Sequence, residues 1–327
     1  MHSRLSNEIK EEALRLGFSA CGIARAESVD KTTAHLFAQW IETKCHAEMA
    51  YMANYSDKRL DPKELMPEVE SIVCVALNYT PQKRISPDQY QIAAYAYGKD
   101  YHDVVKNKLR QLSTYIETQV KKYINDPSFS LIHREFCDTA PVLERYWAVK
   151  AGLGWTGKHH QLIIPNVGSM FVLGEIFLNI PLKYDQPIDN RCGNCRKCID
   201  ACPTKALSKE LFDACKCLSY QLIENRMELS DDTKKKMGNN IYGCDICQSA
   251  CPWNQFAEPT QEEQFMPSND LLNMTQTKWE QLTIDEYQRL FKGSVIKRVK
   301  YDGLMRNIRT AHDFQNSSII DIEKKSS

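Results

Sequence analysis

The chain has 327 residues, of which 43% are hydrophobic and 26% are charged. Such usage is typical of a globular protein of about two domains, and it excludes a disordered chain, a collagen-like fibre and a coiled-coil rod. Lysine and arginine number 42, and so do aspartate and glutamate, so the net charge is zero. Neutrality argues against a protein that coats nucleic acid non-specifically, but it leaves room for a local basic patch.

The predicted elements, in chain order, mix helices with strands. The first is a helix that Ser6 can cap and Gly17 can end, because Ile9, Ala13 and Leu16 recur at helical spacing. Short apolar, β-branched runs predict strands, and apolar residues at every third or fourth position predict an amphipathic helix. The strands are expected at 71–79, 131–136, 162–164 and 170–179, the amphipathic helix at 103–123, and further helices beyond 255.

This mixture predicts an α+β fold. We divide the chain into a mixed domain at 1–185, a cysteine-rich module at 186–255 and a helical segment at 256–327, with a frayed polar tail from about 313. The N-terminal segment lacks the apolar run of a secretory signal, and no run of 18 apolar residues occurs. We therefore expect a cytoplasmic protein without a membrane span, and a monomer.

The cysteines are the most informative residues, because nine of the thirteen lie between residues 192 and 251. In a cytoplasmic chain disulfides are rare, so clustered cysteines indicate metal ligands. The first run, Cys192-x2-Cys195-x2-Cys198-x3-Cys202-Pro203, has the spacing of bacterial ferredoxins that hold [4Fe–4S] clusters. The second run is Cys244-x2-Cys247-x3-Cys251-Pro252, and Cys215 and Cys217 precede it.

Two clusters need eight thiolates, and the last cysteine of a ferredoxin run ligates the other cluster. We predict one cluster on Cys192, Cys195, Cys198 and Cys251, and the other on Cys202, Cys217, Cys244 and Cys247. Spacing alone does not separate Cys217 from Cys215. The main alternative is a zinc ribbon, since paired cysteines two residues apart also bind zinc. Two adjacent clusters would form an electron relay, and the larger domain would then hold the group that receives the electrons.

Six motifs resemble the epoxyqueuosine reductase family, in uninterrupted order up to about residue 310. They are Tyr95 to His102 (YAYGKDYH), Cys137 to Arg145 (CDTAPVLER), Ala151 to Lys158 (AGLGWTGK), Cys217 to Tyr220 (CLSY), Ile241 to Gln248 (IYGCDICQ) and Cys251 to Asn254 (CPWN). The resemblance implies a cobalamin-binding domain, a ferredoxin-like module with two [4Fe–4S] clusters, and kinship with reductive dehalogenases. It implies reduction of epoxyqueuosine to queuosine at the wobble position of tRNA, the last step of queuosine biosynthesis.

The resemblance also implies roles for individual residues. Asp138 would be the proton donor, and such a donor needs a pKa raised by a desolvated site; without the resemblance, Asp138 is an ordinary turn or cap residue before Pro141. The histidines are expected to be ordinary residues and not cobalt ligands. The cofactor-binding candidates, several of which are otherwise plain core aromatics or surface charges, are Arg59, Tyr97, Gly98, Asp138, Arg145, Trp155, Gly157, Lys158, Ser219, Tyr220, Gln221 and Asp245.

The implied partners are the tRNA anticodon stem-loop and an external low-potential electron donor. The expected phosphate contacts are Lys297, Arg298, Lys300, Arg306 and Arg309. Many family members continue into a helical-repeat extension that helps to grip tRNA, and this chain stops soon after His312, which puts the strength and mode of tRNA binding in doubt. The alternatives are a cobalamin reductase of a small molecule, a non-catalytic electron-transfer protein and a zinc-stabilised RNA-binding module.

Overall fold

A central antiparallel sheet organises the first half of the computed structural model, which describes residues 2–124, 126, 128–208 and 211–325, with side chains up to 314. Its strands lie in the order β1-β2-β7-β4. Their bounds are Ala20–Arg25 for β1, Ser71–Asn78 for β2, His133–Phe136 for β4 and Phe171–Leu178 for β7. β2 is buried along nearly its whole length because it lies between β1 and β7 and helices cover both faces. The predicted α+β class is confirmed.

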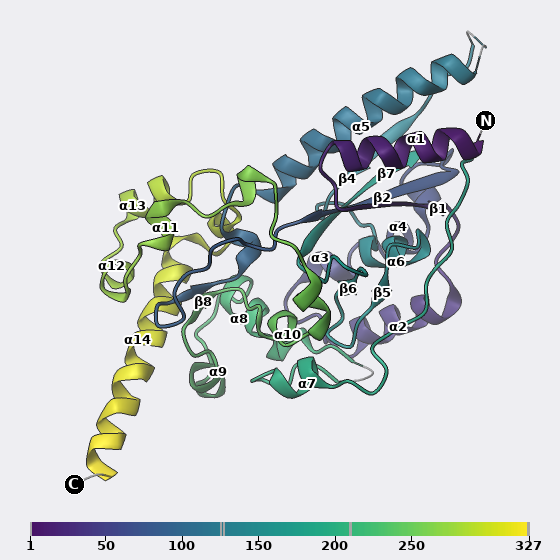
Figure 1. Cartoon of the computed structure of the whole chain (residues 1–327). Helices are drawn as coiled ribbons and strands as arrows, with labels where there is room; N and C mark the ends of the chain where they lie inside the picture. Colours follow the sequence, from purple (N-terminus) through teal and green to yellow (C-terminus); the bar gives the residue numbers. More distant parts are fainter. Residues whose placement is uncertain (1, 125, 127, 209–210, 326–327) are drawn as a thin grey trace.

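Two long helices cover one face of the sheet. They are α1 (His2–Arg15) and α5 (Tyr101–Tyr123), which lie side by side above the strands in Figure 1. The apolar stripe of α5 packs on this face, as its periodicity predicts. α1 begins before Ser6, whose hydroxyl donates to the carbonyl of His2 inside the helix, so the predicted cap is wrong. The predicted end is confirmed, since Gly17 has a φ of +93°.

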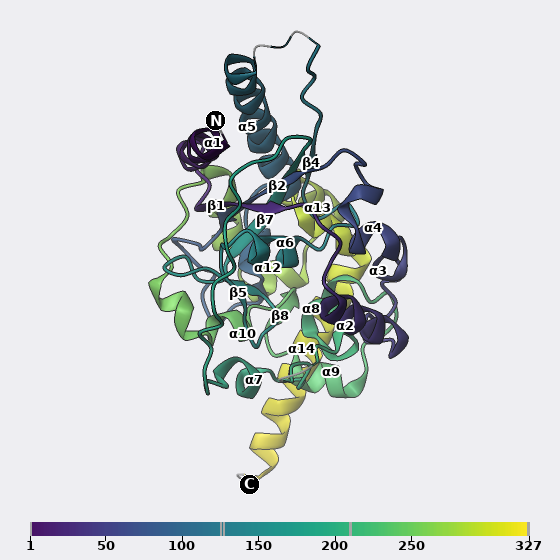
Figure 2. The same cartoon turned by 90° about the vertical axis from the view of Figure 1, so that its right-hand side faces the viewer.

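The other face of the sheet carries α6 (Glu144–Lys150), which follows β4 directly. Smaller elements surround it on the same side (Figure 2). They are α2 (Lys31–Glu42), α3 (Ala50–Ala53), α4 (Ser56–Leu60), and the hairpin of β5 (Trp155–Thr156) and β6 (Leu162–Ile163).

The cysteine-rich module consists of short elements with long connections. They are α7 (Lys197–Ala201), α8 (Leu218–Ile223), α9 (Asp231–Lys236), β8 (Asn240–Tyr242) and α10 (Ile246–Ser249). β8 pairs in parallel with β3 (Gln91–Ile92), so this module is joined to the first domain by backbone hydrogen bonds. The described 3-10 helices are η1 (Pro62–Glu64), η2 (Ala94–Ala96), η3 (Ala214–Lys216), η4 (Pro252–Phe256), η5 (Glu263–Phe265) and η6 (Val295–Val299).

The C-terminal segment is helical, as predicted, with α11 (Asn269–Leu272), α12 (Gln276–Glu280), α13 (Ile284–Leu290) and α14 (Lys300–Lys325). It shares one apolar core with residues 85–97 and with residues 218–242. α14 continues beyond residue 313 and extends away from the body in Figures 1 and 2, where a frayed tail was expected. Among the described residues, no helix is long and apolar enough to cross a membrane.

Candidate active site

The first set of four cysteine side chains, here called the first thiol group, lies where α7 packs against α10. Cys198 has Cys251 and Cys192 as electrostatic neighbours, and Cys251 in turn has Cys192 and Cys195. Four cysteines from two distant stretches of the chain therefore face a common space. The proline after Cys251 starts η4 and turns the chain away from this space.

The second thiol group gathers the remaining cysteines of the two runs with one from the connection between them. Cys247 has Cys244, Cys217 and Cys202 as electrostatic neighbours, Cys244 has Cys217 and Cys202, and Cys217 has Cys202. Cys215 lies outside this group, because its thiol is exposed, donates to the carbonyl of Lys44 at 3.4 Å and has Cys45 as its cysteine neighbour. The structure thus separates two cysteines that spacing left equivalent.

Two predicted cofactor contacts instead hold the cysteine loops in place. Lys158 Nζ donates to the carbonyl oxygens of Gly193 at 2.6 Å and Cys195 at 2.9 Å, so it fixes the first loop. The carboxylate of Asp245 accepts the backbone N–H of Ala94 at 2.7 Å, next to the second thiol group. Burial raises the pKa of this carboxyl.

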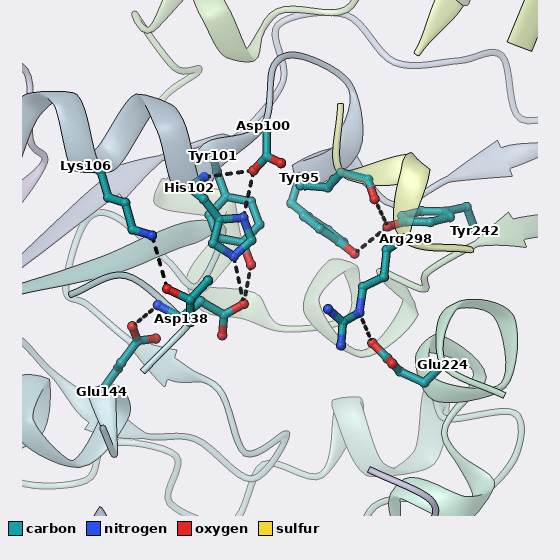
Figure 3. Close-up of polar contacts among 12 residues, drawn as sticks. Tyr95, Asp100, Tyr101, His102, Lys106, Asp138, Glu144, Glu224, Tyr242 and Arg298 are labelled. Atoms are coloured by element: carbon teal, nitrogen blue, oxygen red, sulfur yellow. Dashed lines mark hydrogen bonds and ion pairs between the residues drawn. The ribbon is translucent and has the colours of Figure 1, made fainter. Parts of the chain in front are cut away.

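Asp138 lies in the loop between β4 and α6, with a φ of +56°. Its Oδ2 accepts a hydrogen bond from the Tyr101 hydroxyl at 2.5 Å and lies 3.3 Å from Nε2 of His102. Both side chains come from the first turn of α5 and point toward Asp138 (Figure 3). The other ring nitrogen of His102, Nδ1, lies 2.7 Å from Oδ1 of Asp100. With a carboxylate at each nitrogen, the imidazole is best satisfied when both nitrogens carry protons.

The electrostatics agree with this arrangement. Burial acts to lower the pKa of His102, but the hydrogen bonds to Asp100 and Asp138 outweigh it and raise the pKa to about 9. Burial acts to raise the pKa of Asp138, but the hydrogen bonds from His102 and Tyr101 lower it below its usual range. At neutral pH the proton therefore rests on His102. The expected raised pKa of Asp138 is wrong for this arrangement, because its partners favour the ionised carboxylate.

Three arginines lie within electrostatic reach of Asp138. Arg59 in α4 is buried, and Arg145 in α6 donates to the carbonyl of His160. Burial lowers the pKa of both guanidinium groups. Arg298 approaches from the side opposite α5 (Figure 3). Arg298 also forms an ion pair with Glu224. An anion formed near Asp138 would therefore have guanidinium groups among its neighbours.

Other predicted cofactor residues have structural partners in the protein. A Cβ on Gly98 would lie 2.1 Å from the carbonyl oxygen of Gln264, and one on Gly157 would lie 2.6 Å from Ile163 Cδ1. Protein packing therefore already explains both glycines. The Tyr97 hydroxyl accepts the N–H of Ile85 at 3.4 Å in the core.

The three neighbouring candidates in α8 flank the second thiol group. The backbone N–H groups of Ser219 and Tyr220 point at the Cys217 thiol, and Gln221 Nε2 donates to the carbonyl of Cys215 at 2.6 Å. This end of α8 therefore supports the cysteine loops with its backbone and one amide side chain.

Among the buried polar atoms that have no hydrogen-bond partner in the part of the chain that the structure describes are Arg59 Nε, Trp155 Nε1, His159 Nε2 and His160 Nε2. Trp155 packs against Trp253 beside the first thiol group, and His160 is joined through its carbonyl to Arg145 near Asp138. Buried polar atoms are normally satisfied, so such a set fits a polar cofactor lying between the acid pocket and the thiols. A cobalamin, whose rim carries amides, has the chemistry to meet them.

The predicted basic patch divides into two parts. Arg306 donates to the carbonyls of Gln221 at 3.1 Å and Asn225 at 2.9 Å, so it holds α14 against α8. Lys297, Lys300 and Arg309 are exposed. Arg298 is also exposed, but it forms an ion pair with Glu224. Among the five predicted cations, Lys297, Lys300 and Arg309 can therefore meet a phosphate without loss of a contact within the described chain.

Sequence reasoning missed three residues of this pocket, namely Tyr101, His102 and Glu144. Glu144 accepts the backbone N–H of Asp138. All three belong to the motifs at 95–102 and 137–145, so motif membership was the available signal.

A sheet domain with an acid–base pocket, joined to two groups of four thiols, defines an iron–sulfur oxidoreductase. Residues 191–254 match the family model described as "4Fe-4S double cluster binding domain". Residues 59–139 match the model described as "Epoxyqueuosine reductase QueG, DUF1730". The chain belongs to the epoxyqueuosine reductase family.

Whole-chain similarity supports this assignment. The epoxyqueuosine reductase of Leadbetterella byssophila is 44% identical, over 93% of this chain and 97% of the relative. The enzyme of Cellulophaga algicola is 41% identical, over 93% of this chain and 96% of the relative. The enzyme of Escherichia coli is 36% identical, over 94% of this chain and 81% of the relative.

Solved structures show the same fold. A crystal structure of an epoxyqueuosine reductase with an epoxyqueuosine-modified tRNA-Tyr stem loop has a TM-score of 0.83 at 28% identity, over 95% of this chain and 81% of that chain. The Bacillus subtilis enzyme, with its catalytic loop swung out of the active site, has a TM-score of 0.82 at 26% identity, over 95% and 82%.

Proposed function

We propose that this chain reduces epoxyqueuosine to queuosine in tRNA, with Asp138 and His102 as its proton-transfer pair. The observation that carries the proposal is the Asp138 carboxylate, held between Tyr101 and His102 in a chain that also gathers two groups of four thiols. Removal of an epoxide oxygen as water consumes two electrons and two protons. The thiol groups supply the electron path, and the pocket supplies protons.

The cofactors are two [4Fe–4S] clusters and one cobalamin. When bound, the clusters deliver single electrons at low potential and the cobalamin supplies a strongly reducing cobalt centre. The neighbouring thiols favour Cys192, Cys195, Cys198 and Cys251 for one cluster and Cys202, Cys217, Cys244 and Cys247 for the other. The unpartnered atoms of Arg59, Trp155, His159 and His160 are the proposed polar contacts of the cobalamin.

The protein's own residues manage the protons. His102 holds a proton at neutral pH and passes it through Asp138 Oδ2 to the oxygen or carbon that becomes negative. His102 then takes a proton from solvent and delivers the second proton by the same path. Tyr101 donates to the same oxygen and keeps it oriented. The arginines around Asp138 stabilise the anion before it is protonated.

The proposed division of labour follows the three segments. Residues 1–185 hold the cobalamin and the pocket, 186–255 hold the clusters, and 256–327 complete the core and expose Lys297, Lys300 and Arg309 to the tRNA. A relative is known with an epoxyqueuosine-modified stem loop, which supports the same substrate here. The chain works as a monomer and takes electrons from an external low-potential donor.

The test uses anaerobically purified protein supplied with cobalamin and a stem loop that carries epoxyqueuosine. We expect about eight iron and one cobalt per chain, and queuosine as the product. Asp138→Asn should keep both metals and lose about 10²–10⁴-fold in turnover, the usual contribution of a positioned acid. Asp103→Asn, an exposed change on the same helix turn as His102, is the matched control. Full activity of Asp138→Asn would remove Asp138 from the mechanism.

A further inference from the structure

Glu175 is an acid in the middle of the sheet. It lies in β7, opposite Cys74 of β2 and Phe136 of β4, and is completely buried. Its strand neighbours on the same face, Leu173 and Phe177, belong to the core beneath α6. A charged carboxylate in such a place costs several kcal/mol unless it is paired or neutral.

The group that meets Glu175 is a second carboxyl. Neither oxygen of Glu175 reaches an N–H or O–H donor within the described chain. Its side chain instead lies at hydrogen-bond distance from that of Glu144, the first residue of α6. Two carboxyls form a hydrogen bond only when one of them carries a proton. Burial, followed by the charge of Asp138, raises the pKa of Glu144 to about 7, and burial raises that of Glu175 well above its usual range.

Glu144 connects this pair to the proton-transfer pocket. Its Oε1 accepts the backbone N–H of Asp138, the residue with a positive φ. That conformation is strained for an aspartate, so it persists only where neighbouring groups hold it. Glu144 is one such neighbour, because its carboxylate accepts the Asp138 backbone N–H. This hydrogen bond holds the loop so that the Asp138 side chain points toward Tyr101 and His102.

The titratable and charged groups around the pair come from every element packed against it. Those facing Glu144 are Asp138, Cys137, Cys74, Arg145, Arg59 and Tyr101, and those facing Glu175 are Glu144, Asp138, Cys74 and Cys137. Among the described residues, the groups that face Glu175 are therefore acids and thiols, and a shared proton can compensate for its burial.

We propose that Glu144 and Glu175 share one proton, and that this buried acid pair is a latch that holds the Asp138 loop in its active position. Both are positioning residues, since Glu144 acts through the backbone N–H of Asp138 and Glu175 acts through Glu144. Loss of the shared proton places two like charges side by side in the core and releases the loop. The link to turnover rests on the proposed function, whereas the latch itself does not.

The experiment is hydrogen–deuterium exchange of the 137–143 loop in the cluster-loaded protein between pH 6 and 9, corrected for the intrinsic rate. In the unmodified protein, protection of the loop should fall about tenfold across this range, as local opening becomes easier. Glu175→Gln provides a permanent N–H donor to Glu144. In this variant, protection of the loop should change less than about twofold between pH 6 and 9. Glu144→Leu removes the acceptor, so the loop should be unprotected at every pH.

Iron content and the cluster absorption spectrum show whether each variant is folded, and Glu175→Gln is the conservative member of the set. If Glu175→Gln keeps the pH dependence of the unmodified protein, or if Glu144→Leu leaves the loop protected, the latch is wrong. If exchange behaves as expected but the stem loop is not reduced, the proposed function fails and the latch stands. If both hold, Glu175→Gln should lose the part of the fall in kcat that comes from opening of the loop, without a change in KM, and should keep the fall near pH 9 that follows deprotonation of His102.

Discussion

Replacement of His102 tests the charge balance of the pocket directly. The rise of its pKa from 6.5 to about 9 corresponds to about 3 kcal/mol, at 1.36 kcal/mol per tenfold change in proton affinity. The Asp138 side chain is 58% exposed, so solvent screens its interaction with His102. We therefore expect the raised pKa of His102 to stabilise the folded protein by about 2 kcal/mol. Because the folded-state pKa is raised, this stabilisation is complete below pH 6.5 and is lost as the pH rises through about 9.

His102→Gln should therefore be less stable than the unmodified protein at pH 6 and equal to it near pH 10. The expected difference in melting temperature at pH 6 is on the order of 4 °C, from about 2 °C per kcal/mol for a chain of this size. The assay is anaerobic thermal unfolding of the cofactor-loaded proteins at one scan rate. His35→Gln, at an exposed position of α2, is the control and should show no pH-dependent difference. An equal loss at both pH values would refute the charge argument and leave only lost packing.

Two further predictions concern the clusters and the tRNA. Cys217→Ala should lose about four of eight iron atoms per chain, while Cys215→Ala keeps all eight; the reverse result would transfer the ligand role to Cys215. The double change Lys297→Ala and Lys300→Ala should weaken stem-loop binding and lower the slope of log Kd against log salt by about one to two, as loss of phosphate contacts requires. An unchanged slope would place the phosphate contacts elsewhere.

Local sequence patterns predicted the regular elements well, and spacing indicated the cysteine groups except for the choice between Cys215 and Cys217. β2 and α5 are found almost where their apolar patterns indicate. The pocket was harder to predict, because Asp138 meets His102 only after β4 has paired with β7 and α5 has packed on the sheet. Glu175 lies inside an apolar run that predicts an ordinary strand. The residues of that run do not indicate that Glu175 will contact Glu144 in α6.

The same limit applies to charged residues with structural roles. Lys158 and Arg306 look like phosphate ligands in the sequence, yet each is bound to backbone carbonyls of a distant loop. A cation that satisfies buried carbonyls cannot be told from a binding cation by its neighbours along the chain.

The core that joins the cysteine-rich module to α14 has a consequence for biosynthesis. Buried Asn307 in α14 donates to the carbonyls of Leu222 at 2.9 Å and Ile241 at 2.8 Å, near the two ends of the stretch that separates Cys217 from Cys244. These elements therefore obtain this packing partner only after α14, which follows them in the chain, has been synthesised. We expect the cysteine-rich module not to fold by itself, because α14 supplies part of its core.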